Sequence, residues 1–140
     1  MACTLTPMAD VDWQKLFDAA ELARQRAHAP YSKFHVGAAI ACDDGTIVSG
    51  CNVENASYGL TVCAERNAIG AFVLAAKKKP VAVAIVVDSR TPTPPCGMCR
   101  QVLAEFGEPA LPVASRTLSG AEGRWTLGEL LPHAFTRSFL

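Results

Sequence analysis

Seven consecutive apolar residues, from Val81 to Val87, constrain the fold more than any other segment of the chain. A strand that is apolar on both faces has to be covered on both sides, as a central strand is between two layers of helices. The same run is the longest apolar stretch in the sequence, and it is far shorter than the roughly 20 residues of a membrane-spanning helix. It therefore predicts an α/β fold, with helices on both faces of a sheet.

Apolar side chains recur with helical spacing in three other segments. The first stripe begins at Trp13, and we expect Pro30 to end the helix that carries it. The second stripe is headed by Glu65, an unusual position for a carboxylate on an otherwise apolar face. The third follows two consecutive prolines and ends at Gly107. The first predicted helix thus begins at residue 13 and runs to the residues before Pro30, the second covers residues 63–76 and the third covers residues 96–106. A short helix near the C-terminus covers residues 127–131.

Strands are predicted in the segments between these helices. A run of small and apolar residues precedes the turn Asp43-Asp44-Gly45, and the segment after the turn is its expected hairpin partner. The period of two places Asn52 and Glu54 on one face of that partner. The strands predicted from these patterns are residues 34–42, 47–53, 81–87 and 111–115. The order of the elements predicts one α/β domain over residues 1–140, with crossover helices and a mixed sheet.

The charge balance and the cysteine content limit the function classes. Lys plus Arg and Asp plus Glu each number 13, so the formal net charge is zero. We therefore expect no nucleic-acid partner, because affinity for polyanions comes from neutralised phosphates. A neutral chain also suits self-association. The first ten residues carry no secretory signal pattern, so we expect a cytoplasmic protein without a membrane anchor. In a reducing compartment the six cysteines favour metal binding or catalysis over disulfides.

Three of the cysteines lie where predicted helices begin, namely Cys63, Cys96 and Cys99. The i, i+3 spacing of the last two places both sulfurs on one face of a helix. A helix N-terminus carries partial positive charge, which favours the thiolate form. Three protein ligands leave a fourth position open, as in catalytic zinc sites, whereas structural sites are closed by four. The pattern predicts a catalytic zinc site.

Two neighbours of the first cysteine extend this interpretation. Glu65 lies on the same helical turn as Cys63, where a carboxylate that is not a ligand can move a proton between a water and a substrate. Three thiolates on Zn²⁺ leave a charge of −1, and we expect Arg66 to compensate by hydrogen-bonding the sulfurs. Cys63-Ala-Glu65, followed by Pro-Cys-x-x-Cys ending at Cys99, is a signature of zinc-dependent nucleobase deaminases.

The chain resembles cytidine deaminases of the short, homotetrameric type over nearly its whole length. A cysteine rather than a histidine at position 63 is similar to the tetrameric branch. The resemblance implies a three-layer α/β/α sandwich with a mixed five-stranded sheet and one Zn²⁺ per subunit. The stretches that carry the resemblance are residues 29–38, 52–58, 63–66, 95–101 and 130–135.

The resemblance also implies an activity, the hydrolysis of cytidine and 2′-deoxycytidine to uridine and 2′-deoxyuridine with release of ammonia, in pyrimidine salvage. The implied mechanism is that a zinc-activated water would attack C4 of the ring, while Glu65 would carry protons to N3 and to the leaving amine. Phe34 would pack against the pyrimidine, and Asn52 and Glu54 would bind the ribose hydroxyls. The remaining implied substrate contacts are the Ala64 backbone and, reaching a neighbouring subunit's site, Ala56, Tyr58 and Phe135.

Alternatives to this interpretation remain open. A non-enzymatic structural zinc module would need a fourth ligand and would leave Glu65 unexplained. A deaminase that acts on nucleic acid would need a basic groove. A deaminase of a cytosine-containing antibiotic nucleoside is the nearest enzymatic alternative. Asn52 and Glu54 could instead satisfy backbone groups near a turn, and Phe34 and Phe135 could be core aromatics. The residues without a motif are interpreted as structural or surface residues: Cys3, Cys42, Cys51, His28, His35 and His133.

Overall fold

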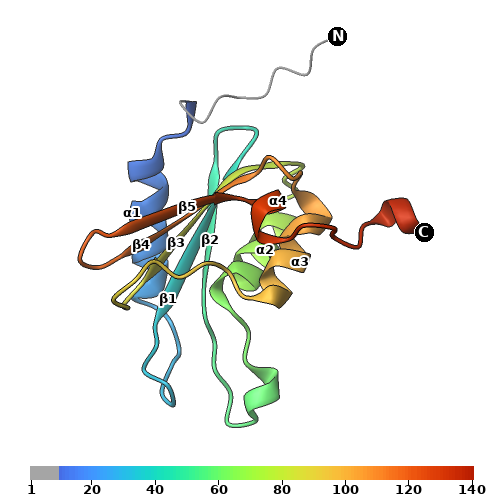
Figure 1. Ribbon diagram of the computed structural model, residues 1–140. Helices are drawn as coiled ribbons and strands as arrows, with labels where there is room; N and C mark the ends of the chain where they lie inside the picture. The colour runs from blue at the N-terminus through green and yellow to red at the C-terminus, as the bar shows by residue number, and fades with distance from the viewer. Residues whose placement is uncertain (1–9) are drawn as a thin grey trace.

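The computed structural model describes residues 10–140, which are organised around a five-stranded mixed sheet (Figure 1). The strand order is β2-β1-β3-β4-β5, with β3 and β4 parallel and the other neighbouring pairs antiparallel. Cys3 lies outside the described residues. The elements are α1 (Trp13–Arg24), β1 (Val36–Cys42), β2 (Ile47–Cys51), η2 (Tyr58–Leu60), α2 (Ala64–Leu74), β3 (Pro80–Val87), α3 (Gly97–Phe106), β4 (Pro112–Thr117), β5 (Glu122–Thr126), α4 (Leu127–Leu130) and η3 (Arg137–Phe139).

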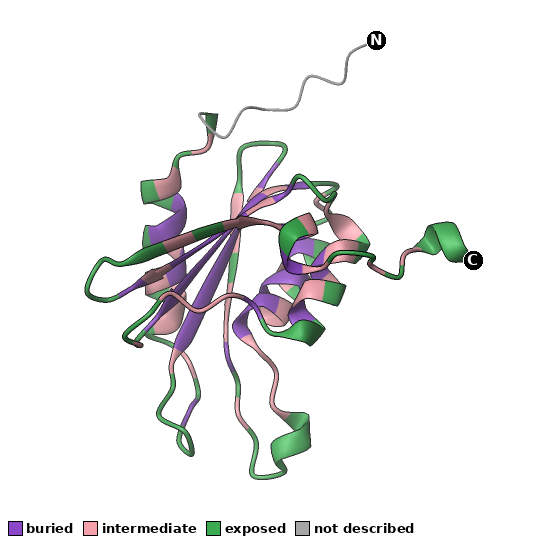
Figure 2. Cartoon of the chain, in the orientation of Figure 1, coloured by how far each residue is buried: buried purple, intermediate pink, exposed green. Residues whose placement is uncertain are grey.

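The central strand β3 has a buried core on each of its faces, as the sequence predicts. Val83 and Ile85 belong to the core cluster that includes Phe72 of α2. Ala82 and Ala84 belong to a second cluster, formed with side chains of α1. Helix α1 thus covers one face of the sheet, and α2 and α3 cover the other (Figure 1). Figure 2 shows the buried residues concentrated on the strands and on the helix faces that meet them. The predicted three-layer sandwich is confirmed.

Helix α1 ends at Arg24, so the prediction that Pro30 terminates it is wrong. The chain leaves the helix earlier because its backbone finds other partners. The His28 N–H donates to the Asn52 carbonyl at 3.0 Å, and the His28 carbonyl accepts from the Glu54 N–H at 2.8 Å. These bonds form a short parallel bridge between His28 and Val53.

The edges of the sheet also differ from the sequence prediction. Strand β2 ends at Cys51, so Asn52 and Glu54 lie in the segment after it and do not share a strand face. Strand β5 was implied only by the family resemblance, because its sequence alternates charged with small and aromatic residues. In this edge strand Glu122 binds Arg116 of β4 at 2.7 Å, which stabilises a strand that apolar periodicity does not reveal. Within residues 10–140, none of the helices has the length and apolar character to cross a membrane.

Two glycines let helices approach the sheet at backbone distance. A Cβ on Gly37 of β1 would lie 1.8 Å from the Ala20 carbonyl oxygen of α1. A Cβ on Gly50 of β2 would lie 2.4 Å from the Ala68 nitrogen and 2.7 Å from the Ala64 carbonyl oxygen, both in α2. Because Ala64 is the first residue of α2, the contact with Gly50 determines where the N-terminus of α2 stands over the sheet.

We predict that Gly50→Ala lowers the free energy of unfolding by about 1–3 kcal/mol, because the new methyl group overlaps backbone atoms that cannot rotate away. Gly70→Ala in α2, the helix that Gly50 contacts, is the matched control, since a Cβ there meets open space. It should raise the free energy of unfolding by about 0.5–1 kcal/mol through helix propensity. Urea denaturation of both variants checks this, and equal stabilities for the two would contradict it.

Candidate active site

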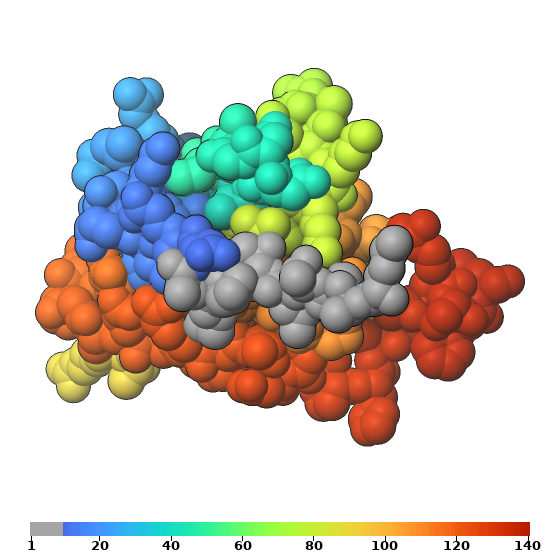
Figure 3. Space-filling view, turned by 90° about the horizontal axis from the view of Figure 1, so that it is seen from above, coloured from blue at the N-terminus to red at the C-terminus, as the bar shows by residue number. Residues whose placement is uncertain are grey.

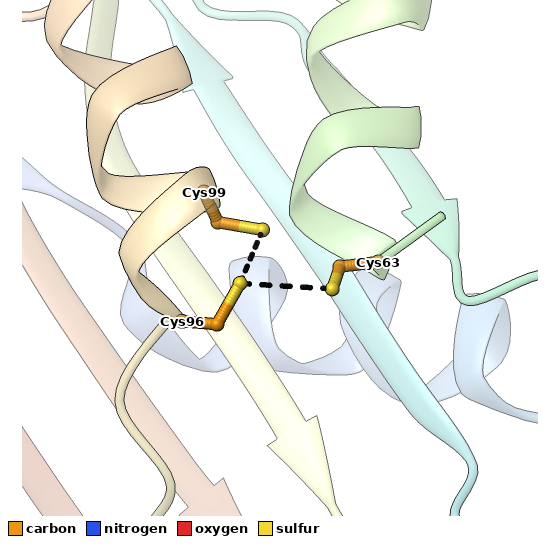
Figure 4. A group of neighbouring side chains, drawn as sticks. All are labelled: Cys63, Cys96 and Cys99. Carbon is orange, nitrogen blue, oxygen red and sulfur yellow. Dashed lines mark hydrogen bonds between the residues drawn. The ribbon is translucent and has the colours of Figure 1, made fainter. Parts of the chain in front are cut away.

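Three cysteine sulfurs meet where two helices begin (Figure 4). Cys63 is the N-cap of α2, Cys96 is the N-cap of α3, and Cys99 lies in the first turn of α3. The Sγ atoms of Cys63 and Cys96 are 3.8 Å apart, and those of Cys96 and Cys99 are 3.5 Å apart. Sulfurs bound to a tetrahedral Zn²⁺ at about 2.3 Å lie roughly 3.8 Å from one another. The group therefore has the dimensions of a zinc site.

No further His, Cys, Asp or Glu side chain of residues 10–140 belongs to this group. Cys42 and Cys51 are free cysteines elsewhere in the fold. A three-cysteine group with a fourth position left to water or substrate is the donor set of a catalytic zinc site, whereas a structural site has four protein ligands.

The thiols of the group interact strongly with one another. The neighbouring Cys99 thiol, followed by the Arg66 guanidinium, lowers the pKa of Cys63 to about 5, against the opposing effect of burial. The pKa of Cys99 is raised, because the adjacent Cys63 sulfur favours the protonated form of Cys99 and because the thiol is buried. The arrangement thus concentrates negative charge at the helix N-termini, where a dication can replace thiol protons.

Arg66 lies beside the group, as expected from the sequence. Its Nη2 atom is 3.7 Å from the Cys63 sulfur and 3.3 Å from the Thr61 carbonyl oxygen. Its Nε atom is buried and has no hydrogen-bond partner among the described residues. A partly buried guanidinium with an unused donor, placed against a thiolate, suits a site whose sulfurs carry excess negative charge.

Glu65 is a buried carboxyl group on the first turn of α2, with 5% of its surface exposed. Burial raises the pKa of Glu65 above its usual value. A carboxyl group whose pKa is shifted toward neutrality can both accept and return a proton. Glu65 lines the same pocket as Cys63 and Cys96, so a proton carrier and the sulfur group face one space.

That pocket has a volume of about 230 Å³. Its walls come from the loop before β1 and the start of that strand, the segment that links β2 to α2, the end of β3, and the starts of α2 and α3 with the loop before α3. The predicted site residues that line it are Phe34, Asn52, Glu54, Ala64 and Glu65, with Cys63 and Cys96. The other lining residues were not predicted from the sequence, and the polar ones among them are Ser32, Thr61 and Thr93. Ser32 lies inside the stretch 29–38 that carries the resemblance, which was the available signal.

Asn52 and Glu54 satisfy backbone groups and also line the pocket, so the two interpretations of these residues are compatible. The Asn52 side chain accepts from the Val36 N–H at 2.8 Å and donates to the Phe34 carbonyl at 2.7 Å. Glu54 Oε1 accepts from the N–H groups of Tyr31 and Ser32 at 3.0 and 3.1 Å. Their predicted contacts with ribose stay predictions.

Ala56, Tyr58 and Phe135 are exposed and do not line the pocket of their own subunit. Tyr58 is 75% exposed and Phe135 is 60% exposed. The C-terminal segment that includes Phe135 projects from the body of the protein (Figures 1 and 3). Its backbone is held by Gln101, whose Nε2 donates to the Phe135 carbonyl at 2.8 Å. The predicted role of these three residues in a neighbouring site is consistent with their exposure and stays a prediction.

This fold and this arrangement of three cysteines and a carboxyl group define the class of zinc-binding deaminases. Residues 11–115 match the model of the family described as "Cytidine and deoxycytidylate deaminase zinc-binding region". The chain belongs to this family.

Individual relatives agree with that assignment. The chain is 45% identical over 130 residues to a cytidine deaminase of Sporosarcina psychrophila, covering 93% of this chain and 96% of that protein. The crystal structure of a cytidine deaminase from Burkholderia pseudomallei matches with a TM-score of 0.85 and 45% identity, covering 89% of this chain and 100% of that one. A blasticidin-S deaminase of Bacillus cereus is 31% identical over 135 residues, or 89% of this chain and 95% of that protein.

We predict that Cys99→Ser abolishes high-affinity zinc binding, because a serine hydroxyl is a poor replacement for a thiolate ligand. Cys51→Ser is the matched control, since Cys51 lies outside the sulfur group. Metal analysis of the two purified variants after dialysis measures the outcome. Stoichiometric zinc in Cys99→Ser, or loss of zinc from Cys51→Ser, would refute the assignment of the ligands.

Proposed function

We propose that this chain catalyses the hydrolytic deamination of cytidine and 2′-deoxycytidine to uridine and 2′-deoxyuridine with release of ammonia, as a cytoplasmic enzyme of pyrimidine salvage. The single observation that carries the proposal is the placement of the buried Glu65 in one pocket with the cysteine group. Membership of the deaminase family and the similarity to cytidine deaminases support the reaction and the substrate class.

Cys63, Cys96 and Cys99 would hold one Zn²⁺ per subunit. When bound, the ion would supply Lewis acidity that lowers the pKa of a water molecule to near neutrality, which makes that water a nucleophile. Glu65 is not a ligand in this proposal, because its role is to move protons. Its carboxylate takes one proton from the attacking water and delivers it to N3 of the ring. It then carries the second proton of that water to the amine at C4, which leaves as ammonia.

Two groups of residues in the pocket would contact the two parts of the nucleoside. Phe34 and the Ala64 backbone would contact the pyrimidine, close to Glu65. Asn52 and Glu54 would bind the ribose hydroxyls from the segment after β2. The hydroxyl of Ser32, followed by the backbone N–H groups, lowers the pKa of Glu54, so the carboxylate is a charged acceptor at neutral pH.

The quaternary structure is part of the proposal. We infer a homotetramer in which Ala56, Tyr58 and Phe135 contribute to a neighbouring subunit's site, with residues 1–140 as a single domain. The exposure of Tyr58 and Phe135 supports this, since large aromatic side chains at the surface favour a partner surface.

A deaminase of an antibiotic nucleoside is the less favoured function. The similarity to a blasticidin-S deaminase, at 31% identity, is lower than the 45% identity to a cytidine deaminase. A structural zinc module is not favoured either, because the group found within residues 10–140 has three cysteines and leaves room for a fourth ligand from solvent.

We predict that the zinc-loaded protein converts the ultraviolet spectrum of cytidine into that of uridine. Glu65→Ala should keep its zinc and lose roughly 10²–10⁴-fold in kcat, because the proton carrier is removed while the ligands stay in place. Glu105→Ala, an exposed carboxylate of α3, is the control and should be fully active. Loss of zinc from Glu65→Ala would contradict its role, and an inactive wild type would overturn the proposed substrate.

We predict that Glu54→Gln raises KM for cytidine roughly tenfold, because a charged hydrogen-bond acceptor for the ribose is replaced by a neutral one. Steady-state kinetics with cytidine and with 1-methylcytosine, which has no ribose, measure the effect. The variant should leave kcat/KM for 1-methylcytosine within about twofold of the wild type. An equal loss with both substrates would remove the ribose contact from the mechanism.

A further inference from the structure

Ser32 joins two residues of the proposed substrate site that are far from each other in sequence. Its hydroxyl donates to Glu54 Oε2 and accepts from the Phe34 N–H at 3.0 Å. Its own N–H donates to Glu54 Oε1 at 3.1 Å. Ser32 also lines the pocket, although no role was predicted for it from the sequence.

The hydrogen-bonding capacity of Glu54 shows what Ser32 leaves available. Each carboxylate oxygen can accept about two hydrogen bonds. Oε1 accepts two, from the N–H groups of Tyr31 and Ser32. Oε2 accepts one bond within residues 10–140, from the Ser32 hydroxyl, so it retains one acceptor position. The hydroxyl has a single proton, which it donates to Glu54, and therefore it cannot also donate to a substrate.

We propose that Ser32 is a positioning residue that holds Glu54 so that the remaining acceptor position of Oε2 faces a sugar hydroxyl of the nucleoside. This inference rests on the proposed function. Ser32 acts through Glu54 and is not expected to bind the nucleoside itself. Because the same hydroxyl accepts the Phe34 N–H, it also ties the contact with the sugar to the residue that would pack against the base.

The loop around Ser32 is built to hold one conformation. The Phe34 carbonyl accepts from the Asn52 side chain at 2.7 Å, so the Phe34 backbone is bound on both sides, by Ser32 and by Asn52. Lys33, between Ser32 and Phe34 in the sequence, has a φ of 60°, a left-handed conformation that is unfavourable for a residue with a side chain. Its N–H donates to the Ala29 carbonyl at 3.0 Å, which closes the turn. A strained turn persists only when the surrounding structure holds it in that conformation, and these hydrogen bonds hold this one.

The experiment measures KM and kcat for cytidine in zinc-loaded variants. Two of them change Ser32 alone, one is Glu54→Ala, and one combines Ser32→Val with Glu54→Ala. Ser32→Thr keeps the hydroxyl, and Ser32→Val has the same shape without it. We expect Ser32→Val to raise KM roughly tenfold with kcat within about twofold, because a charge-assisted hydrogen bond that orients Glu54 is lost. Ser32→Thr should stay within about threefold of the wild-type KM. The exposed Ser49→Ala of β2 is the unrelated serine control and should be unchanged.

A double-mutant cycle separates positioning through Glu54 from a general structural role. In the Glu54→Ala background, Ser32→Val should raise KM by less than about twofold further, because the carboxylate that Ser32 orients is absent. If Ser32→Val raises KM as much in the Glu54→Ala background as it does in the wild type, the two residues act independently and the inference is overturned. It is also overturned by an active wild type whose KM for cytidine is unchanged by Ser32→Val. A zinc-loaded wild type that does not deaminate cytidine would overturn the proposed function, and this inference with it.

Discussion

The convergence of two helix N-termini on one group of sulfur atoms is the constraint on which the rest of this structure depends. Cys63 begins α2, and Cys96 begins α3, so their sulfurs meet only if both helices lie on the same face of the sheet with their first turns level. The close contact between Gly50 and α2 sets the height of one helix. Side chains of the apolar strand β3 belong to the same buried core as the inner faces of both helices.

The pocket beside the sulfur group is formed by loops that bind one another. The segment from residue 31 to residue 36 has its backbone hydrogen-bonded by side chains that come from after β2. Asn52 and Glu54 therefore support the loop that carries Phe34 while they face the pocket themselves. Under the proposed function, a substrate site made in this way is ordered before the nucleoside arrives, which lowers the entropic cost of binding.

Much of this fold follows from local patterns in the sequence. The apolar run of β3 and the stripes of the three long helices are properties of residues that are close in sequence, and the structure confirms both. The cysteine spacing is another such property, and the structure brings the three sulfurs together. The end of α1 could not be predicted locally, because it depends on a backbone pairing between His28 and Val53. Strand β5 is stabilised by ion pairs that leave no apolar period. The contact of Ser32 with Glu54 could not be predicted locally either, because the two residues are 22 positions apart in the sequence.

The central claim is that the three cysteines form an open zinc site, and X-ray absorption spectroscopy at the zinc edge of the zinc-loaded protein tests it most directly. The structure predicts three sulfur neighbours at about 2.3 Å and one oxygen or nitrogen neighbour at about 2.0 Å. Addition of uridine, the product, should change the light-atom neighbour and leave the three sulfurs in place. Four sulfur neighbours, or a spectrum that does not respond to a nucleoside, would contradict the account and favour a closed structural zinc site.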